Sequence, residues 1–139
     1  NYQQIPEMVG MFQKEVAERT AAVPRTKDYG ILSVLVQAYY DVKYLFTVHE
    51  NVFNPPPKVK SGVIKLTRNR KEGLEGNEIL FKQIVKTGFG QRRKKLSNAL
   101  KSLDIPEVLK SHAFMDKRAE ELSVEDFINF TKEWKAAKN

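Results

Sequence analysis

The stretch VFNPPPKVKSGVIKL, residues 52–66, contains the strongest backbone constraint in this chain. Its three consecutive prolines, Pro55 to Pro57, fix φ at about −65° and lack the N–H group that a sheet ladder needs, so they form a stiff, extended segment. Phe53 therefore lies just before this rigid segment, between two predicted strands. We call residues 53–57 the proline bracket. We interpret Phe53 either as a core side chain capped by a proline-rich loop or as an aromatic platform for a flat ligand such as a nucleobase.

Upstream of this bracket, strand patterns and helix patterns follow one another. Met8–Phe12 is a continuous apolar run, which is typical of a strand buried on both faces. Lys14–Ala21 has the spacing of a short amphipathic helix. Asp28 is a candidate cap for a helix from Tyr29 to Tyr40, which is apolar almost all round and should be deeply buried. Residues 41–48 alternate as a half-exposed strand does.

Downstream of the prolines, the pattern changes from strands to helices. A third strand is predicted at Val59–Leu66, and a polar linker containing glycines follows it. We place a domain boundary in this linker, so that residues 1–68 form an α/β unit and residues 69–139 form a small all-α domain. Ser123 is the predicted cap of the last helix, which has one apolar stripe formed by Val124, Phe127, Ile128, Phe130 and Trp134. The predicted helices lie near residues 77–87, 91–103, 106–111 and 123–137.

The composition is that of a globular protein. With 139 residues the chain can bury a core, and it contains no cysteine, which excludes disulfide frameworks and zinc fingers and suits a reducing cytoplasm. No apolar run approaches the roughly 20 residues of a membrane helix, so we expect no membrane span. The chain begins at Asn1, directly before a strand of central composition, and we therefore expect it to be part of a longer protein.

The positive charge is concentrated in one segment. The chain has a net charge of +7, and residues 79–103 contain seven basic residues and no acidic one. A predicted helix from Gln91 would place the basic residues 92–95 in or near its first turn, where cations oppose the helix dipole. Bound anions would explain this arrangement better than a merely solvated face does. The candidate polyanion-binding residues are Arg92, Arg93, Lys94, Lys95 and Lys101.

Other motifs do not support catalysis by these residues alone. Gly88–Arg93 opens like a dinucleotide-binding fingerprint, but it lacks the third glycine and does not follow a strand. His49 and His112 are isolated from other metal ligands or catalytic partners, and we interpret them as structural or solvent-facing histidines. The sequence contains no phosphate-binding loop of the P-loop type.

Five segments resemble, in order and spacing, the KsgA-type family of small-subunit rRNA adenine dimethyltransferases. They are MFQKEVAER (11–19), YGILSV (29–34), FNPPPKV (53–59), FGQRRKKL (89–96) and RAEELS (118–123). The resemblance extends over essentially the whole chain but covers only the C-terminal half of that family. It implies the last three strands of a Rossmann-like methyltransferase sheet, followed by a small helical rRNA-docking domain.

The resemblance also implies a set of functional residues. Phe53 matches the aromatic that stacks on the flipped target adenine, and residues 92–94 match a basic cluster that contacts rRNA. The S-adenosylmethionine site is expected upstream of Asn1. Two positions depart from the family pattern: Lys60 stands where aspartate is usual, and Ser97 stands where arginine is common.

The implied activity is transfer of methyl groups to N6 of two adjacent adenines near the 3′ end of small-subunit rRNA during ribosome biogenesis in the cytoplasm. The 30S precursor would be the partner, and these 139 residues alone should be inactive. One alternative is a large-subunit rRNA adenine methyltransferase of the macrolide-resistance type. Another is a non-enzymatic DNA- or RNA-binding module with Gly90–Leu103 as its recognition helix.

The same resemblance implies a strand order of first, third, second, with the third strand antiparallel between the other two. Met8–Phe12 would then lie on the outside of the sheet, despite its central composition. Because an exposed apolar strand edge is a template for pairing, we expect the isolated chain to self-associate through Met8–Phe12 or to bury that edge by rearranging its N-terminus.

Overall fold

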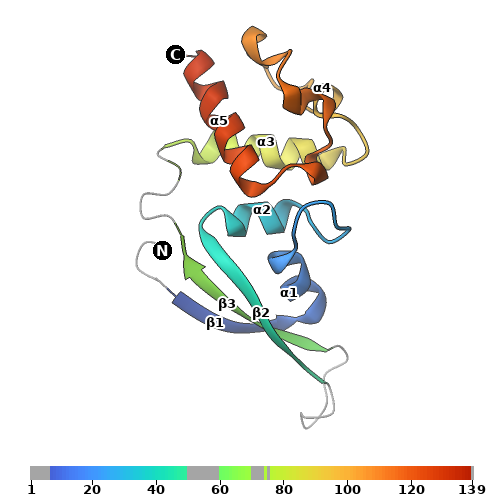
Figure 1. The fold of residues 1–139 in the computed structure, drawn as a ribbon, viewed down its shortest axis with the longest axis vertical. Coiled ribbons are helices and arrows are strands. Elements are labelled where there is room, and N and C mark those ends of the chain that lie inside the picture. Colours follow the sequence, from blue (N-terminus) through green and yellow to red (C-terminus); the bar gives the residue numbers. More distant parts are fainter. Residues whose placement is uncertain (1–6, 50–59, 70–73, 75, 139) are drawn as a thin grey trace.

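The computed structural model describes residues 7–49, 60–69, 74 and 76–138. Its sheet consists of β1 (Glu7–Gln13), β2 (Tyr40–Val48) and β3 (Ser61–Arg68). The order is β1-β3-β2, and β3 is antiparallel to both neighbours. This confirms the expected strand order. The helices that follow β3 in the sequence lie at the opposite end of the molecule from the sheet (Figure 1).

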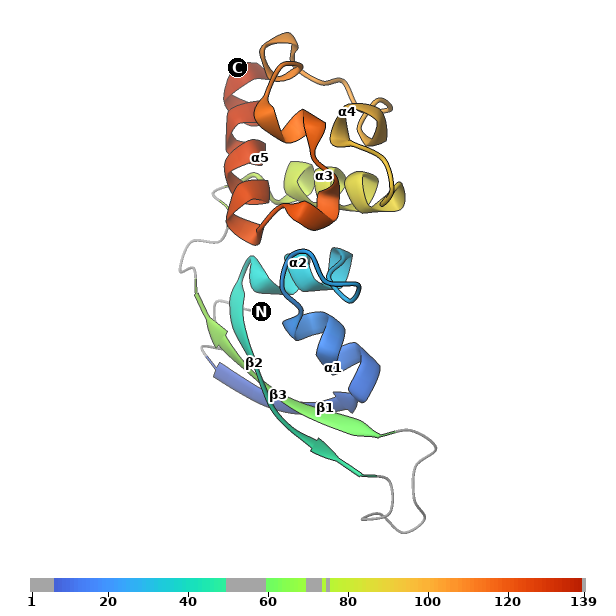
Figure 2. The ribbon, with the colours of Figure 1, turned by 45° about the vertical axis from the view of Figure 1, so that its right-hand side comes forward.

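The burial of β1 differs from the prediction. Val9 is 57% exposed and Met11 is 53% exposed, so β1 is not buried on both faces. Among the described residues β1 has a strand partner on one edge alone, and α1 (Lys14–Ala21) lies on one side of the sheet (Figure 2). The apolar run therefore predicted the strand correctly, but its surroundings here leave most of its side chains exposed.

A small core lies between α1 and the sheet. It contains Ala17 of α1 together with Ile64 and Leu66 of β3. Gly62 permits this close approach, because a Cβ atom there would stand 2.7 Å from the Ala17 Cβ and 2.8 Å from the Tyr44 hydroxyl. A side chain at position 62 would therefore push α1 or β2 away from β3.

Helix α2 (Ile31–Gln37) is shorter than predicted, and its cap is different. Gly30, not Asp28, is the N-cap residue. The Gly30 N–H donates to the Ser33 hydroxyl at 3.1 Å, and this hydroxyl donates to the backbone carbonyl of Arg19. Burial of the helix is confirmed for Val34, which is fully buried, although Leu32 is exposed.

The remainder is helical: its first and last helices match the predicted ones closely, and the two predicted between them are much shorter. The long helices are α3 (Glu78–Gly90) and α5 (Val124–Lys138). Between them lie α4 (Leu96–Ala99) and three single 3₁₀ turns. The predicted helix over 106–111 is one of these turns. The three turns are η2 (Glu107–Leu109), η3 (Ala113–Asp116) and η4 (Ala119–Glu121).

The start and burial of α5 confirm the prediction. The Asp126 N–H donates to the Ser123 hydroxyl at 3.0 Å, and the Ser123 N–H donates to the Asp126 carboxylate at 3.0 Å. This reciprocal pair satisfies N–H groups that the first turn of a helix leaves without partners. The predicted apolar stripe lies inside, since Phe127, Ile128, Phe130 and Trp134 are buried.

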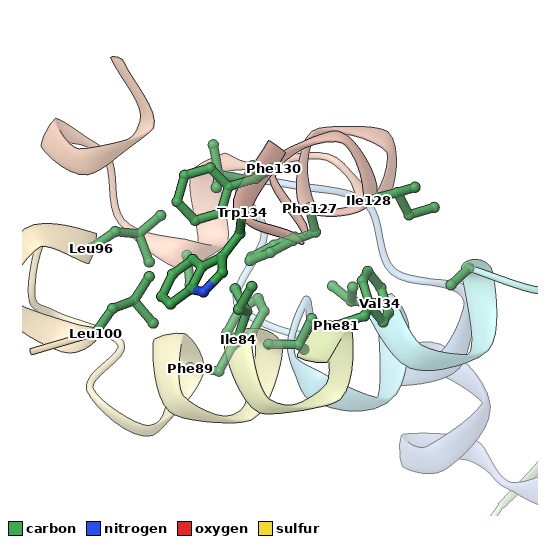
Figure 3. Packing of buried hydrophobic residues seen from close by; sticks show 14 of the residues in the cluster. Val34, Phe81, Ile84, Phe89, Leu96, Leu100, Phe127, Ile128, Phe130 and Trp134 are labelled. Atoms are coloured by element: carbon green, nitrogen blue, oxygen red, sulfur yellow. The ribbon is translucent and has the colours of Figure 1, made fainter. Parts of the chain in front are cut away.

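The larger hydrophobic core joins α2 to the helical region (Figure 3). Tyr29 and Val34 pack in one cluster with Phe81 and Ile84 of α3 and with Phe127 of α5. This core thus includes residues from both sides of the predicted boundary at 68/69. The division into two domains stays a prediction. No helix among the described residues is both long and apolar enough to cross a membrane.

Candidate nucleic-acid interface

The basic residues 92–95 lie in a loop, not in a helix. Helix α3 ends at Gly90, Gln91 has non-helical angles (φ −128°, ψ 65°), and α4 contains only the four residues Leu96–Ala99. The predicted helix over 91–103 is therefore wrong. The alternative of a DNA- or RNA-binding module that uses Gly90–Leu103 as a recognition helix loses the element on which it depended.

Tertiary pairing explains why the helix is interrupted. Lys95 forms an isolated antiparallel bridge with Arg118, and the Leu96 N–H donates to the Lys117 carbonyl at 2.8 Å. These bonds use backbone groups that a continuous helix would have paired within itself. The dipole argument changes as well, because the loop follows the C-terminal, negative end of the 13-residue helix α3, where cations are favoured.

Arg92 is held by acceptors within the protein. Its guanidinium donates to the carbonyl oxygens of Tyr29 at 2.5 Å, Thr26 at 3.1 Å and Lys27 at 3.3 Å. It also contacts the Glu120 carboxylate at 3.5 Å and stands 5.7 Å from the centre of the Phe89 ring. Because these contacts occupy the guanidinium, the Arg92 side chain is only 34% exposed.

The next three basic side chains project into solvent. Arg93, Lys94 and Lys95 are exposed, and no ion pair joins any of them to a residue that the structure describes. The loop thus presents three consecutive cations that no carboxylate of the described residues compensates. Such a group can bind phosphate oxygens with little competition from the protein's own acids.

Lys101 lies at the edge of a hollow in the surface. It is exposed and lines an open hollow of about 470 Å³ together with Ser97, Asp104 and Lys110. The Asp104 carboxylate is paired with Lys138 at 2.7 Å, and this hydrogen bond holds the Asp104 pKa below its usual value. The hollow therefore combines both signs of charge.

A segment of the N-terminal half borders the basic loop. The Arg25 N–H donates to the Glu120 carbonyl at 2.9 Å, and the Arg25 guanidinium pairs with the Glu121 carboxylate at 3.1 Å. The buried Tyr29 hydroxyl donates to the Leu122 carbonyl at 2.8 Å. Burial, reinforced by the negative charge of Asp126, raises the Tyr29 pKa well above its usual value. Nothing in the sequence pattern predicted these contacts.

The comparisons identify the family. The sequence profile described as "Ribosomal RNA adenine dimethylase" matches residues 1–136, which is nearly the whole chain. The chain belongs to the ribosomal RNA adenine dimethylase family. A protein of Cytophaga hutchinsonii named "Ribosomal RNA small subunit methyltransferase A" is 58% identical over 129 residues, covering 93% of this chain and 50% of that protein. The dimethylase-family chain thus spans about half the length of the curated relatives it matches.

Solved structures show the same fold. A dimethyladenosine transferase from Plasmodium falciparum superposes with a TM-score of 0.85 at 24% identity, covering 96% of this chain and 58% of that one. The 23S rRNA methyltransferase ErmE superposes with a TM-score of 0.63 at 21% identity, covering 94% and 55% respectively. At these identities the likeness shows the fold alone. It confirms the predicted fold class, strands and helices of a Rossmann-like methyltransferase followed by a helical part.

The family implies use of S-adenosylmethionine, but the described residues of this dimethylase-family chain do not fit that cofactor. A Rossmann-like cofactor site has a glycine-rich loop between a strand and a helix. The nearest sequence, at Gly88 and Gly90, lies instead in the last turns of α3. Gly88 serves close packing there, since a Cβ atom would stand 3.2 Å from the Leu96 side chain.

Two further predicted features have different outcomes. Phe53 and the three prolines lie outside the described residues, so the stacking role of Phe53 stays a prediction for this dimethylase-family chain. Lys60 is described: its side chain is exposed, and its carbonyl accepts the Lys14 N–H at 2.8 Å. The unusual lysine therefore adds a positive charge at the start of β3 without disturbing the backbone contact.

Proposed function

We propose that these residues are the C-terminal half of an S-adenosylmethionine-dependent enzyme that dimethylates N6 of two adjacent adenines near the 3′ end of small-subunit rRNA. The supporting observation is the 58% identity to a protein named "Ribosomal RNA small subunit methyltransferase A". The partner would be small-subunit rRNA within the 30S precursor, and the enzyme would act in the cytoplasm during ribosome biogenesis. The cofactor site would lie upstream of Asn1, so the 139 residues alone would be inactive.

Within this function, the exposed loop and the proline bracket have separate tasks. Arg93, Lys94 and Lys95 would bind rRNA phosphates, because they are exposed and free of ion pairs with the described residues. Lys101 would extend this contact from its neighbouring hollow. Phe53 would stack on the extruded adenine. The guanidinium of Arg92 is engaged within the protein and is therefore less available to rRNA phosphates.

The experiment that tests this function is methyl transfer by the full-length protein to immature small ribosomal subunits. We expect N6,N6-dimethyladenosine at two adjacent positions near the 3′ end of small-subunit rRNA, detected by mass spectrometry of digested RNA. The 139-residue chain should yield none. Dimethylation of large-subunit rRNA instead would favour the macrolide-resistance alternative, and absence of any methyl product would contradict the proposal.

We also propose that the isolated 139-residue chain pairs with a second copy through the open edge of β1. Val9 and Met11 are more than half exposed, and no described strand pairs with this edge. Light scattering should therefore give a mass above that of a monomer, and Met11→Lys should restore the monomer because a charge disfavours edge pairing. The matched control is Val108→Lys, which adds the same charge to an exposed position of η2. A monomeric unmodified chain would refute the idea.

A further inference from the structure

Three segments that are distant in sequence meet at the basic loop. Residues 25–29 contact the loop through the hydrogen bonds that Arg92 donates to three of their carbonyls. The loop contacts residues 117 and 118 through backbone hydrogen bonds, and Arg25 closes the arrangement by donating its N–H to the Glu120 carbonyl. The surface around the loop is thus assembled from both halves of the chain.

Arg92 is suited to hold these segments together, and a lysine would not be. Its planar guanidinium reaches three carbonyl oxygens and the Glu120 carboxylate at once. An ammonium group is a compact point charge on a flexible stem and cannot match this fork. The charge of Arg92 is also compensated locally, by aligned carbonyl dipoles and by Glu120, which reduces its attraction for an outside phosphate.

Lys27 lies at this surface because of the hydrogen bonds that Arg92 donates to residues 26–29. The Lys27 carbonyl accepts from Arg92 at 3.3 Å, so its backbone lies at the end of the Arg92 side chain, which extends from the loop that bears Arg93 and Lys94. The Lys27 side chain is exposed and forms no ion pair with any described residue. By contrast, its basic neighbour Arg25 is paired with Glu121.

We infer that Arg92 is a positioning residue that fastens residues 26–29 to the basic loop, and that Lys27 thereby joins Arg93, Lys94 and Lys95 in one phosphate-binding surface. This inference rests on the proposed rRNA-binding function. It assigns a contact in residues 1–57, which contain five basic and six acidic residues. It also gives Arg92 a role distinct from that of its basic neighbours.

The first test measures binding of the full-length protein to a structured RNA from the 3′ end of small-subunit rRNA, over a range of salt concentrations. Lys27→Gln should reduce the slope of log K against log salt by roughly 0.7–0.9 and weaken binding roughly fivefold at about 0.15 M salt. Lys43→Gln, on the exposed surface of β2, is the matched control and should change neither quantity. An unchanged slope for Lys27→Gln would overturn the inference.

A double-mutant cycle separates positioning from simple stabilisation. When Arg92 is replaced by glutamine, residues 26–29 lose their fastening, so the added effect of Lys27→Gln on affinity should fall from roughly fivefold to less than about twofold. An Arg92 that only stabilised the fold would leave the two effects additive. Additivity would therefore refute the positioning role.

Arg92→Lys keeps the charge but removes the fork, and it provides a readout that does not depend on RNA. We expect Arg92→Lys and Arg92→Gln to lower the Tm by similar amounts, roughly 4 °C or more, and Arg93→Gln to leave it unchanged. If Arg92→Lys instead behaves like the unmodified protein in both Tm and salt slope, Arg92 acts as a simple cation and the inference is wrong. If the unmodified protein shows no salt-dependent RNA binding, the proposed function fails, and so does the Lys27 contact. The Tm values of the Arg92 and Arg93 variants would still show whether Arg92 holds residues 26–29 against the loop.

Discussion

Replacing Tyr29 by alanine should lower the free energy of unfolding by about 3–5 kcal/mol, as expected for truncation of a buried aromatic side chain. Tyr29 is fully buried, its ring meets the Phe89 ring edge-on at 5.8 Å, and its hydroxyl donates to the Leu122 carbonyl at 2.8 Å. The side chain thus joins the α1–α2 connection to α3 and to the segment before α5. Urea-induced unfolding of the full-length protein measures the loss.

Two further variants make this result interpretable. Tyr29→Phe keeps the ring but leaves the buried Leu122 carbonyl without its donor, and it should cost about 1–3 kcal/mol. Ile79→Ala is the control, because Ile79 is 78% exposed and its truncation should change stability by less than about 0.5 kcal/mol. Equal stability of Tyr29→Phe and the unmodified protein would show that the hydroxyl contributes nothing at this junction.

Replacing Phe53 by alanine in the full-length protein should slow methyl transfer, because the extruded adenine loses its stacking partner. The expected loss is about 1–3 kcal/mol of transition-state stabilisation, or roughly 5- to 150-fold in rate. The measurement is single-turnover methylation of immature small subunits, with S-adenosylmethionine affinity expected to stay the same. Phe46→Ala, at an exposed phenylalanine of β2, is the matched control.

The alternative interpretation of Phe53 predicts a different pattern. A core phenylalanine capped by the prolines would, on truncation, lower the unfolding temperature while each folded molecule kept its normal activity. Measuring both stability and activity per folded molecule on the same samples distinguishes the two interpretations.

Local signals in the sequence predicted several elements well. The cap at Ser123 and the apolar stripe of α5 depend on residues three and four positions apart. Because these interactions are local, the sequence pattern is enough to predict them. The strands were predicted in the same way from runs and alternation. Their spatial order came instead from the family resemblance, because an apolar run predicts a strand but not its neighbours, and for β1 it did not predict the exposure either.

The interpretation failed where distant contacts decide the backbone. Residues 91–103 have a helical pattern, but the bonds of Lys95 and Leu96 to residues 117 and 118 interrupt it. The same limitation hid the role of Arg92, whose three carbonyl acceptors lie more than 60 positions away in the sequence. The four basic residues 92–95 look equivalent in the sequence, yet the Arg92 side chain faces the protein and the next three side chains face solvent.

The core that α2 shares with α3 and α5 has a consequence for how the molecule unfolds. Because Tyr29 and Val34 fill the same cluster as Phe81 and Phe127, the helical region cannot lose α2 without opening its own interior to water. Amide hydrogens of α2, α3 and α5 should then exchange with solvent in one common opening event, as a single cooperative unit. A polypeptide beginning at residue 69 would lack part of that unit, and we expect it to be a loosely packed state rather than an independent folded domain.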